Sequence, residues 1–502
     1  MIIFFIGFLY AFAKFPGVDS HGGYCGFTFK IIYPDSLPGD SIGNHLAMIS
    51  LHSVLVKTFG DLWLDDRFVL TIYFFLVIAS LLGIDRLSVL FVVTNKLGRL
   101  AVMAILMFEH MFIDNVPHIV GIQTFRPSNY AQPLGIWLAY FLLKDPKAIR
   151  TLSLSCIFLL TTIKNGWFPF FITGLFTLKE VFHTKWTRIV TVMIFASMLI
   201  FSGHYFWSLS QDTILQNVFL FDNAILNIEN SETNPFQDGL GPLLYISFIL
   251  FASFVKFPDE KIEARIRALF FISILVYLIG GIYYTFAPDQ IKIPHLVPLA
   301  VSRSTWWTQI IGFLYLSCWV IRLFDNASPK KKIFLASMLF LLYVFPIFNY
   351  VSYRTFFVNY YIINPVIYSI CGFILVLLVL SVVCYHRDNF KMFGMILRNN
   401  TFLRTAVYLP IILFTICFLS YNSYKRVPQL SFMFNHGILG KTASAKWIGV
   451  SDFFRYETDK NSKVIAFSRK NNQLEFDDSI KVRSGRTMPG GHVFTAYFDY
   501  DR

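Results

Sequence analysis

The chain has 502 residues, of which 55% are hydrophobic and 15% are charged, and its formal net charge at pH 7 is +13. This apolar fraction excludes an ordinary soluble domain, whose core cannot bury so many apolar residues. The Lys and Arg residues do not form one stripe with interleaved aromatics, so the positive charge does not indicate a nucleic-acid partner.

Apolar blocks follow one another along the chain, and most are long enough to cross ~30 Å of hydrocarbon as helices. They span residues 1–15, 67–94, 100–113, 129–143, 151–163, 166–178, 189–208, 241–256, 268–286, 304–321, 333–352, 361–385 and 405–421. Blocks shorter than ~17 residues either extend into the flanking sequence or re-enter the membrane from one side. We therefore predict an all-α polytopic membrane protein with about 12–13 transmembrane helices over residues 1–421.

The first block has two interpretations. It is short, has no basic residue at its start, and contains Ala11-Phe12-Ala13, which resembles a signal-peptidase site. Residues 1–13 are either the first span or a cleaved signal. In both cases residue 16 lies outside the cytoplasm.

The distribution of basic residues predicts the orientation of the chain. With a cytoplasmic N-terminus, twenty Lys and Arg residues lie in cytoplasmic loops and seven in the opposite loops. The stretch 209–240, on the opposite side, holds five acids and no Lys or Arg. Because basic residues stay in the cytoplasm during insertion, we predict an integral multi-pass protein with its C-terminus outside.

Three segments on the outer side are long enough to carry function: the first loop 16–66, the loop 209–240 and the tail 422–502. In the first loop, apolar residues recur at helical spacing and predict an amphipathic helix on the membrane surface: Leu46, Met48, Leu51, Val54, Leu55 and Phe59. The tail has short strand-like runs such as 463–467 between Asn, Asp and Gly turns, which predicts a small extracytoplasmic α/β domain or part of one.

Several common site motifs are missing. There is no P-loop, no GxGxxG between a strand and a helix, no GxSxG and no HExxH, so cytoplasmic ATP is not an expected ligand of this chain. The six cysteines show no CxxC or Cys/His ligand spacing and predict neither a disulfide framework nor a zinc site.

The first outer loop offers candidate catalytic acids. Asp35 and Asp40 lie in Tyr33-Pro34-Asp35-Ser36-Leu37-Pro38-Gly39-Asp40, where proline and glycine favour a turn. A carboxylate presented on such a turn can act as a general base. The alternative is that both are solvated turn residues without a catalytic role.

Cationic or potentially cationic residues lie at block ends on the same side: Arg126, Lys164, His295, Arg303 and Arg354. Together they form a candidate site for a phosphate group, which Arg binds with two parallel hydrogen bonds. Each one alone also fits a side chain that reaches toward lipid headgroups. As a set they are more informative, because basic residues are otherwise disfavoured on this side.

Several segments resemble bacterial multi-spanning proteins of the GT-C glycosyltransferase superfamily. The similarity covers most of the chain, although each motif is short. It is carried by residues 33–60, by 125–170 with Arg126-Pro127-Ser128-Asn129-Tyr130 and Gly166-Trp167-Phe168-Pro169, by Arg303-Ser304-Thr305, and by Ala445-Lys446-Trp447-Ile448 with Arg483-Ser484-Gly485-Arg486.

This resemblance implies an inverting transferase in a bacterial inner membrane. Its substrates would be a polyprenyl-phosphate-linked sugar donor and an extracytoplasmic glycan, lipid or protein acceptor. It implies Asp40 as the first choice for the base and Asp35 as the second. The adjacent acidic pair typical of that loop occurs here only as Asp65-Asp66, late in the loop. No cofactor is predicted with certainty. A divalent cation stays open, since some relatives use one.

Three other classes of protein remain as alternatives. A transporter of lipid-linked sugars would show inverted repeats and charges in mid-membrane. An oligosaccharide polymerase or ligase would use a large late outer loop, whereas here the large loop comes first. A polysaccharide-assembly protein with a degenerate site would keep the fold without the chemistry.

Overall fold

A computed structural model of the chain describes part of its residues. These are residues 2–15, 51–107, 128–146, 149–161, 163–181, 241–286, 301–328, 400–436, 467–470 and 473–476, with isolated positions between 189 and 457. All structural statements below concern these residues.

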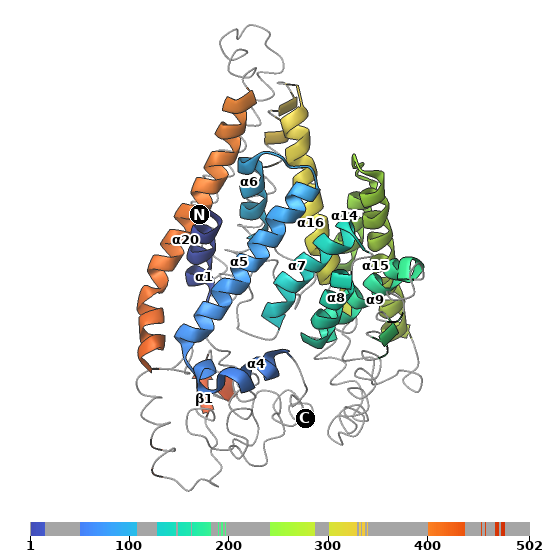
Figure 1. The fold of residues 1–502 in the computed structure, drawn as a ribbon. Coiled ribbons are helices and arrows are strands. Elements are labelled where there is room, and N and C mark those ends of the chain that lie inside the picture. Colours follow the sequence, from blue (N-terminus) through green and yellow to red (C-terminus); the bar gives the residue numbers. More distant parts are fainter. Residues whose placement is uncertain are drawn as a thin grey trace.

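The described chain is mostly helical and forms an elongated bundle (Figure 1). Its helices are α1 Ile2–Lys14, α5 Asp66–Leu90, α6 Lys96–Leu106, α7 Ser128–Lys144, α8 Ile149–Thr161, α9 Ile163–Val181, α14 Gly241–Phe254, α15 Glu260–Phe286, α16 Val301–Asn326 and α20 Asn400–His436. Each helix coincides with an expected apolar block. The blocks 189–208, 333–352 and 361–385 lie largely or wholly outside the described residues.

Four of the described helices have the length and composition to cross a membrane: Asp66–Leu90, Glu260–Tyr283, Thr305–Asn326 and Arg404–Pro428. Shorter apolar helices are Ile2–Lys14, Arg150–Thr161 and Pro242–Phe254. A helical membrane protein is thus supported. The number of 12–13 spans stays a prediction, because much of the chain lies outside the described residues.

Large apolar side chains remain exposed on the outer helices. On α15 they recur every three or four residues and make one stripe along the helix: Phe271, Leu275, Ile279, Ile282 and Phe286. Such a continuous apolar surface is unfavourable in water and favourable in lipid. This stripe therefore fits a lipid-facing side of the bundle.

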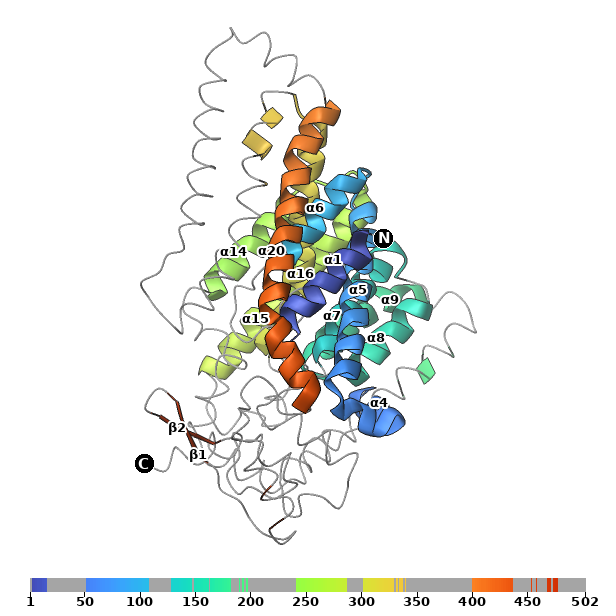
Figure 2. The ribbon, with the colours of Figure 1, turned by 90° about the vertical axis from the view of Figure 1, so that its left-hand side faces the viewer.

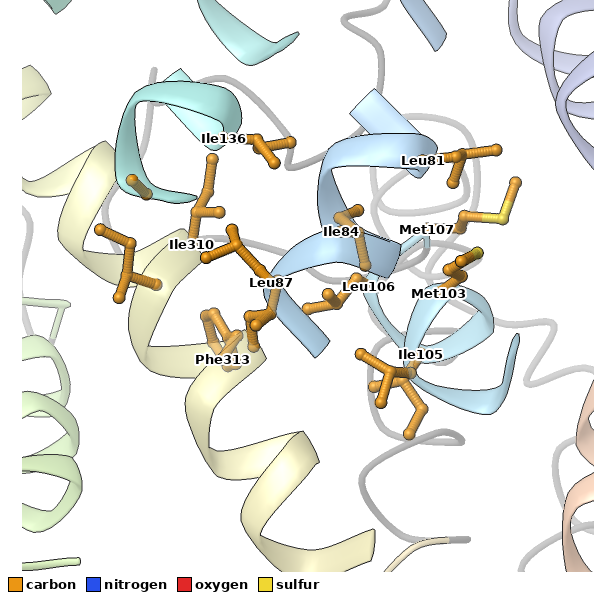
Figure 3. Close-up of a cluster of buried hydrophobic side chains, with 14 of the residues drawn as sticks. Leu81, Ile84, Leu87, Met103, Ile105, Leu106, Met107, Ile136, Ile310 and Phe313 are labelled. Atoms are coloured by element: carbon orange, nitrogen blue, oxygen red, sulfur yellow. The ribbon is translucent and has the colours of Figure 1, made fainter. Parts of the chain in front are cut away.

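Helix α16 is the central helix of the bundle. In its candidate span 83% of the most apolar window is buried, compared with 33% in that of α20. Figure 3 shows Ile310 and Phe313 of α16 close to Leu87 of α5, with side chains of α6 and α7 around them. Residues of four helices thus meet in one apolar core beside α16.

Helix α1 packs against α5 and α20, which lie far from it in the sequence (Figures 1 and 2). Ala11 and Ala13, which resemble a signal-peptidase site, are both buried. Arg426 Nη1 donates to the Ala13 carbonyl at 3.3 Å, and Ser423 Oγ donates to the Leu9 carbonyl at 2.9 Å. These contacts pack α1 into the described bundle.

The surface helix expected in the first loop is present over its described part. Helix α4, Leu51–Phe59, and the 3₁₀ turn η1, Gly60–Leu64, lie across the lower end of the bundle in Figure 1. Helices α5, α7, α9 and α16 begin at this end, which we call the α4 end. Val54 and Phe59 are exposed on α4, whereas His52 and Ser53 are buried. Part of the predicted apolar stripe is thus exposed, as in a helix at a lipid interface, whereas Leu55 packs against the core of the bundle.

The opposite end of the bundle carries ion pairs between neighbouring helices. Arg99 Nε donates to Asp85 Oδ1 at 2.7 Å and joins α6 to α5. Arg404 Nε donates to Asp325 Oδ1 at 2.6 Å and joins α20 to α16, while Tyr408 donates to the same carboxylate at 3.2 Å. Carboxylates within the bundle therefore neutralise part of the basic charge at this end.

The C-terminal part differs from the expectation. Strands β1 Phe467–Lys470 and β2 Gln473–Phe476 form one antiparallel hairpin, with Phe467 opposite Phe476. Of the run 463–467, only Phe467 is described, and it begins β1. Helix α20 also continues to His436, beyond the apolar block expected to end at 421. The predicted small α/β domain is therefore not supported by the described residues, which contain this hairpin alone as strand structure.

Gly166 allows α8 and α9 to form a tight helical hairpin. A Cβ at this position would lie 2.6 Å from the Phe158 carbonyl oxygen and 2.7 Å from Leu159 Cα. Both are backbone atoms, so the contact cannot be relieved by a side-chain rotation. In Gly166→Ala, the clash should lower the free energy of unfolding by ~1–3 kcal/mol. The higher helix propensity of Ala offsets ~1 kcal/mol of this loss. Thermal unfolding of the purified protein in detergent measures this change.

Gly98→Ala provides a matched control. The atom closest to a Cβ at Gly98 is Ile321 Cγ2 at 3.1 Å, the end of a side chain that can shift. This variant should unfold close to the wild-type temperature. If both variants lose the same amount of thermal stability, the backbone contact at Gly166 does not cause the loss.

Candidate functional site

Three hydroxyl groups fix α16 against α14 and α15 near its first turns. The Tyr245 hydroxyl lies 2.6 Å from Ser273 Oγ and 2.9 Å from Thr308 Oγ1, and Ser273 Oγ lies 2.9 Å from Thr308 Oγ1. All three are buried. Because each hydroxyl both donates and accepts, the three satisfy one another inside an apolar bundle.

An indole hydrogen bond joins the N-terminal halves of α7 and α16. Trp307 Nε1 donates to the Gly135 carbonyl at 2.8 Å. The Trp307 ring also packs edge-to-face against Phe168 of α9, with the ring centroids 6.4 Å apart. The neighbouring Trp306 packs against Phe158 of α8 at 6.1 Å. Four helices are therefore held together at the α4 end.

Two of the expected cations lie in this region. Lys164 is in the first turn of α9, and Arg303 is in the first turn of α16. The helix N-termini that carry them point their partial positive charge toward the α4 end. Basic side chains and helix N-termini together favour an anionic ligand.

The other expected site residues lie outside the described residues. They are Asp35, Asp40, Arg126, His295 and Arg354. Their proximity to Lys164 and Arg303 therefore stays a prediction. Within the part of the chain that the structure describes, no group of three His, Cys, Asp or Glu side chains is placed to hold a metal ion.

The adjacent pair Asp65 and Asp66 stands at the start of α5. Asp65 is the N-cap of this helix, and its Oδ1 accepts from the Arg67 amide at 2.9 Å. This is the common helix-capping role of an aspartate. Asp66 is buried in the first turn. The capping contact therefore gives Asp65 a structural role.

His52 was not anticipated as a site residue, although it belongs to the surface helix α4. It is only 3% exposed, its Nδ1 lies 3.4 Å from the Tyr130 hydroxyl of α7, and its ring packs edge-to-face on Trp63. Burial lowers the pKa of His52 to about 4, so the docked imidazole is neutral near pH 7. His52 thereby anchors α4 on the helix whose start carries the Arg-Pro-Ser-x-Tyr motif.

Asn165 and Trp306 are two further residues that the sequence did not indicate as functional. Both are buried at the α4 end, and the Asn165 amide and the Trp306 indole nitrogen have no hydrogen-bond partner among the described residues. Asn165 lies within the segment 125–170, directly after Lys164, and Trp306 directly follows Arg303-Ser304-Thr305. Only the packing distinguishes them from ordinary helix residues.

Comparison of the sequence with protein families, curated proteins and solved structures gives no match. The candidate site is therefore defined by its residues and their geometry alone.

The burial of His52 predicts a pH dependence of α4 docking. An undocked histidine has a pKa near ~6.5, above that of the docked state, so the undocked state binds more protons between the two values. The stabilisation that comes from docking the neutral His52 is fully present above pH ~6.5. It falls by ~1.4 kcal/mol per pH unit as the pH drops toward 4. Thermal unfolding of the wild type and of His52→Phe, measured from pH 7.5 to 4.5, should show a steeper acid loss in the wild type.

Tyr130→Phe serves as the control for this experiment. It removes the hydroxyl beside His52 but leaves the imidazole able to titrate. It should keep the pH slope of the wild type at a lower overall stability. Identical slopes for the wild type and His52→Phe would mean that His52 does not control docking.

Proposed function

We propose that this protein is a GT-C-like membrane glycosyltransferase that transfers a sugar from a polyprenyl-phosphate-linked donor to an extracytoplasmic acceptor. In this proposal the α4 end faces away from the cytoplasm. The excess of Lys and Arg in the loops expected at the opposite end supports this orientation. The C-terminal tail then lies outside the cytoplasm as well.

The observation that carries the proposal is the position of Lys164 and Arg303 in the sequence of two adjacent helices. Each stands in the first turn of its helix, and the two helices pack through Phe168 and Trp307. Two cations beside two helix N-termini suit a phosphate group at the membrane surface. Helix α4 lies at the same end, where an amphipathic helix can support a lipid-linked substrate.

The chemistry requires mainly placement and charge. In the proposed step the Asp40 carboxylate takes the proton of an acceptor hydroxyl, and the hydroxyl oxygen attacks the anomeric carbon. The bond from this carbon to the phosphate oxygen breaks, and the configuration at the carbon inverts. Arg126, Lys164 and Arg303 stabilise the charge on the departing lipid phosphate, while His295 and Arg354 are further candidates for this role.

The phosphate site can be tested by binding. Arg126→Gln and Arg303→Gln should each weaken binding of a polyprenyl-phosphate donor by ~1.5–3 kcal/mol, the contribution of a hydrogen bond to a charged group. Titration of the labelled lipid into purified protein in nanodiscs measures the affinity. Unchanged affinity in both variants would remove these residues from the site.

Arg322→Gln is the matched control, because Arg322 lies on α16 at the opposite end. It donates from Nη2 to the Lys256 carbonyl at 3.1 Å, so its loss affects stability at that end. Donor affinity should remain at the wild-type value. A loss equal to that of Arg303→Gln would indicate that donor binding depends on the overall charge of α16.

The catalytic base can be tested by Asp40→Asn. Asn is tolerated in turns and at helix N-caps about as well as Asp but cannot accept the proton, so folding should survive. Turnover should fall ~10²–10⁴-fold with donor binding largely retained. Transfer is followed with purified protein and a radiolabelled donor. Transfer at the wild-type rate would make Asp40 a turn residue and move the assignment to Asp35 or to the pair Asp65-Asp66.

A further inference from the structure

Two neighbouring tryptophans on α16 differ in one respect. Trp306 and Trp307 are both fully buried. Trp307 donates its indole hydrogen to Gly135, whereas Trp306 Nε1 has no hydrogen-bond partner among the described residues. The Trp306 ring is nevertheless tightly placed, because a Cβ on Gly135 would lie 3.0 Å from its Cη2. The indole hydrogen of Trp306 is therefore a fixed donor that no described residue uses.

Asn165 on α9 offers both a donor and an acceptor. It is 1% exposed, and neither its Nδ2 nor its Oδ1 has a hydrogen-bond partner among the described residues. Its backbone carbonyl also lacks the usual helical partner, since residue 169 is proline and has no N–H. By contrast, the Asn422 amide of α20 donates to the Phe418 carbonyl at 2.8 Å. The Asn422 amide is thus satisfied within its own helix, and the Asn165 amide is not satisfied among the described residues.

Buried polar groups without hydrogen-bond partners lower the stability of a protein unless a ligand completes their hydrogen bonds. Asn165 and Trp306 are each uncharged, and they belong to helices that pack against each other at the α4 end. Phosphate oxygens at neutral pH need mainly donors. A sugar hydroxyl needs an acceptor as well as a donor, and the Asn165 amide provides both.

We propose that Asn165 and Trp306 form a subsite for the hydroxyl groups of the sugar whose phosphate is held by Lys164 and Arg303. This inference rests on the proposed function and assigns to these two residues the recognition of the sugar. In the bound state the Trp306 indole donates to one hydroxyl oxygen. The Asn165 amide donates to a second hydroxyl oxygen and accepts a hydroxyl hydrogen at Oδ1.

The test uses Asn165→Leu and Trp306→Phe, which keep most of the packing volume and remove the hydrogen-bonding groups. Purified full-length protein in nanodiscs is titrated with a bare polyprenyl phosphate and with the same lipid carrying a hexose, an N-acetylhexosamine or a pentose. The wild type should bind at least one sugar conjugate more tightly than the bare lipid. Each variant should lose about tenfold in affinity for that conjugate and none for the bare lipid.

Two matched controls separate recognition from folding. Asn422→Leu and Trp307→Phe remove groups that are hydrogen-bonded within the protein, so both should lower the unfolding temperature and leave the preference for the sugar conjugate intact. Asn165→Leu should unfold at or above the wild-type temperature, because it removes an unsatisfied buried group. Trp306→Phe also leaves a cavity beside the smaller ring, so its unfolding temperature should fall, but by less than that of Trp307→Phe, which loses a hydrogen bond as well.

The outcomes distinguish this inference from the proposed function. Equal losses for the bare lipid and the sugar conjugate, or no loss for either, overturn the sugar subsite while the phosphate site stands. A wild type that binds the bare lipid but prefers no sugar conjugate also overturns the subsite alone. A wild type that binds neither lipid overturns the proposed function and the subsite with it.

Discussion

The hydrogen bond from Trp307 to the Gly135 carbonyl determines how the central helix meets its neighbours. It joins α16 to α7 at the α4 end, and Gly135 lets the adjacent Trp306 ring approach the α7 backbone. The Trp307 ring also contacts α9, so the positions of Lys164 and Arg303 depend on the same packing. In a lipid environment, where apolar burial between helices adds little, such close packing and buried hydrogen bonds hold helices together.

Most buried polar groups among the described residues have a hydrogen-bond partner. The few that lack one therefore need an explanation. The hydroxyls of Tyr245, Ser273 and Thr308 bond to one another, and His52 reaches Tyr130. Satisfied groups of this kind fix the arrangement of helices in a medium that offers no water. The unsatisfied groups of Asn165 and Trp306 lie close to the expected cations in the sequence, at the end where α4 docks. The destabilisation that these unsatisfied groups cause would be offset if a ligand supplied the missing hydrogen bonds.

The two ends of the bundle differ in their chemistry. At the opposite end, Arg99 and Arg404 pair with carboxylates of neighbouring helices. At the α4 end, Asp65 caps a helix and the helix N-termini of α5, α7, α9 and α16 gather. Two basic side chains at the opposite end are therefore held in ion pairs between helices, whereas the helix N-termini at the α4 end present partial positive charge.

The sequence by itself determined the helical membrane class and the location of the helices. Apolar block length follows directly from bilayer thickness, so α5, α15, α16 and α20 could be predicted from composition alone. The amphipathic spacing around Leu51–Phe59 likewise identified α4. The tail was less predictable, because short strand-like runs do not specify whether a whole domain surrounds them.

Some residues of the candidate site could be predicted from the sequence, and others could be found only in the structure. Lys164 and Arg303 were predicted because basic residues are uncommon on the side opposite the cytoplasm. His52, Asn165 and Trp306 carry no such signal, since a polar or aromatic residue in a helix is ordinary in sequence. Only the tertiary structure decided that the indole of Trp307 is satisfied and that of Trp306 is not. The physical reason is that hydrogen-bond satisfaction depends on which carbonyl of a neighbouring helix lies within reach, and this is determined by helix packing rather than by local sequence.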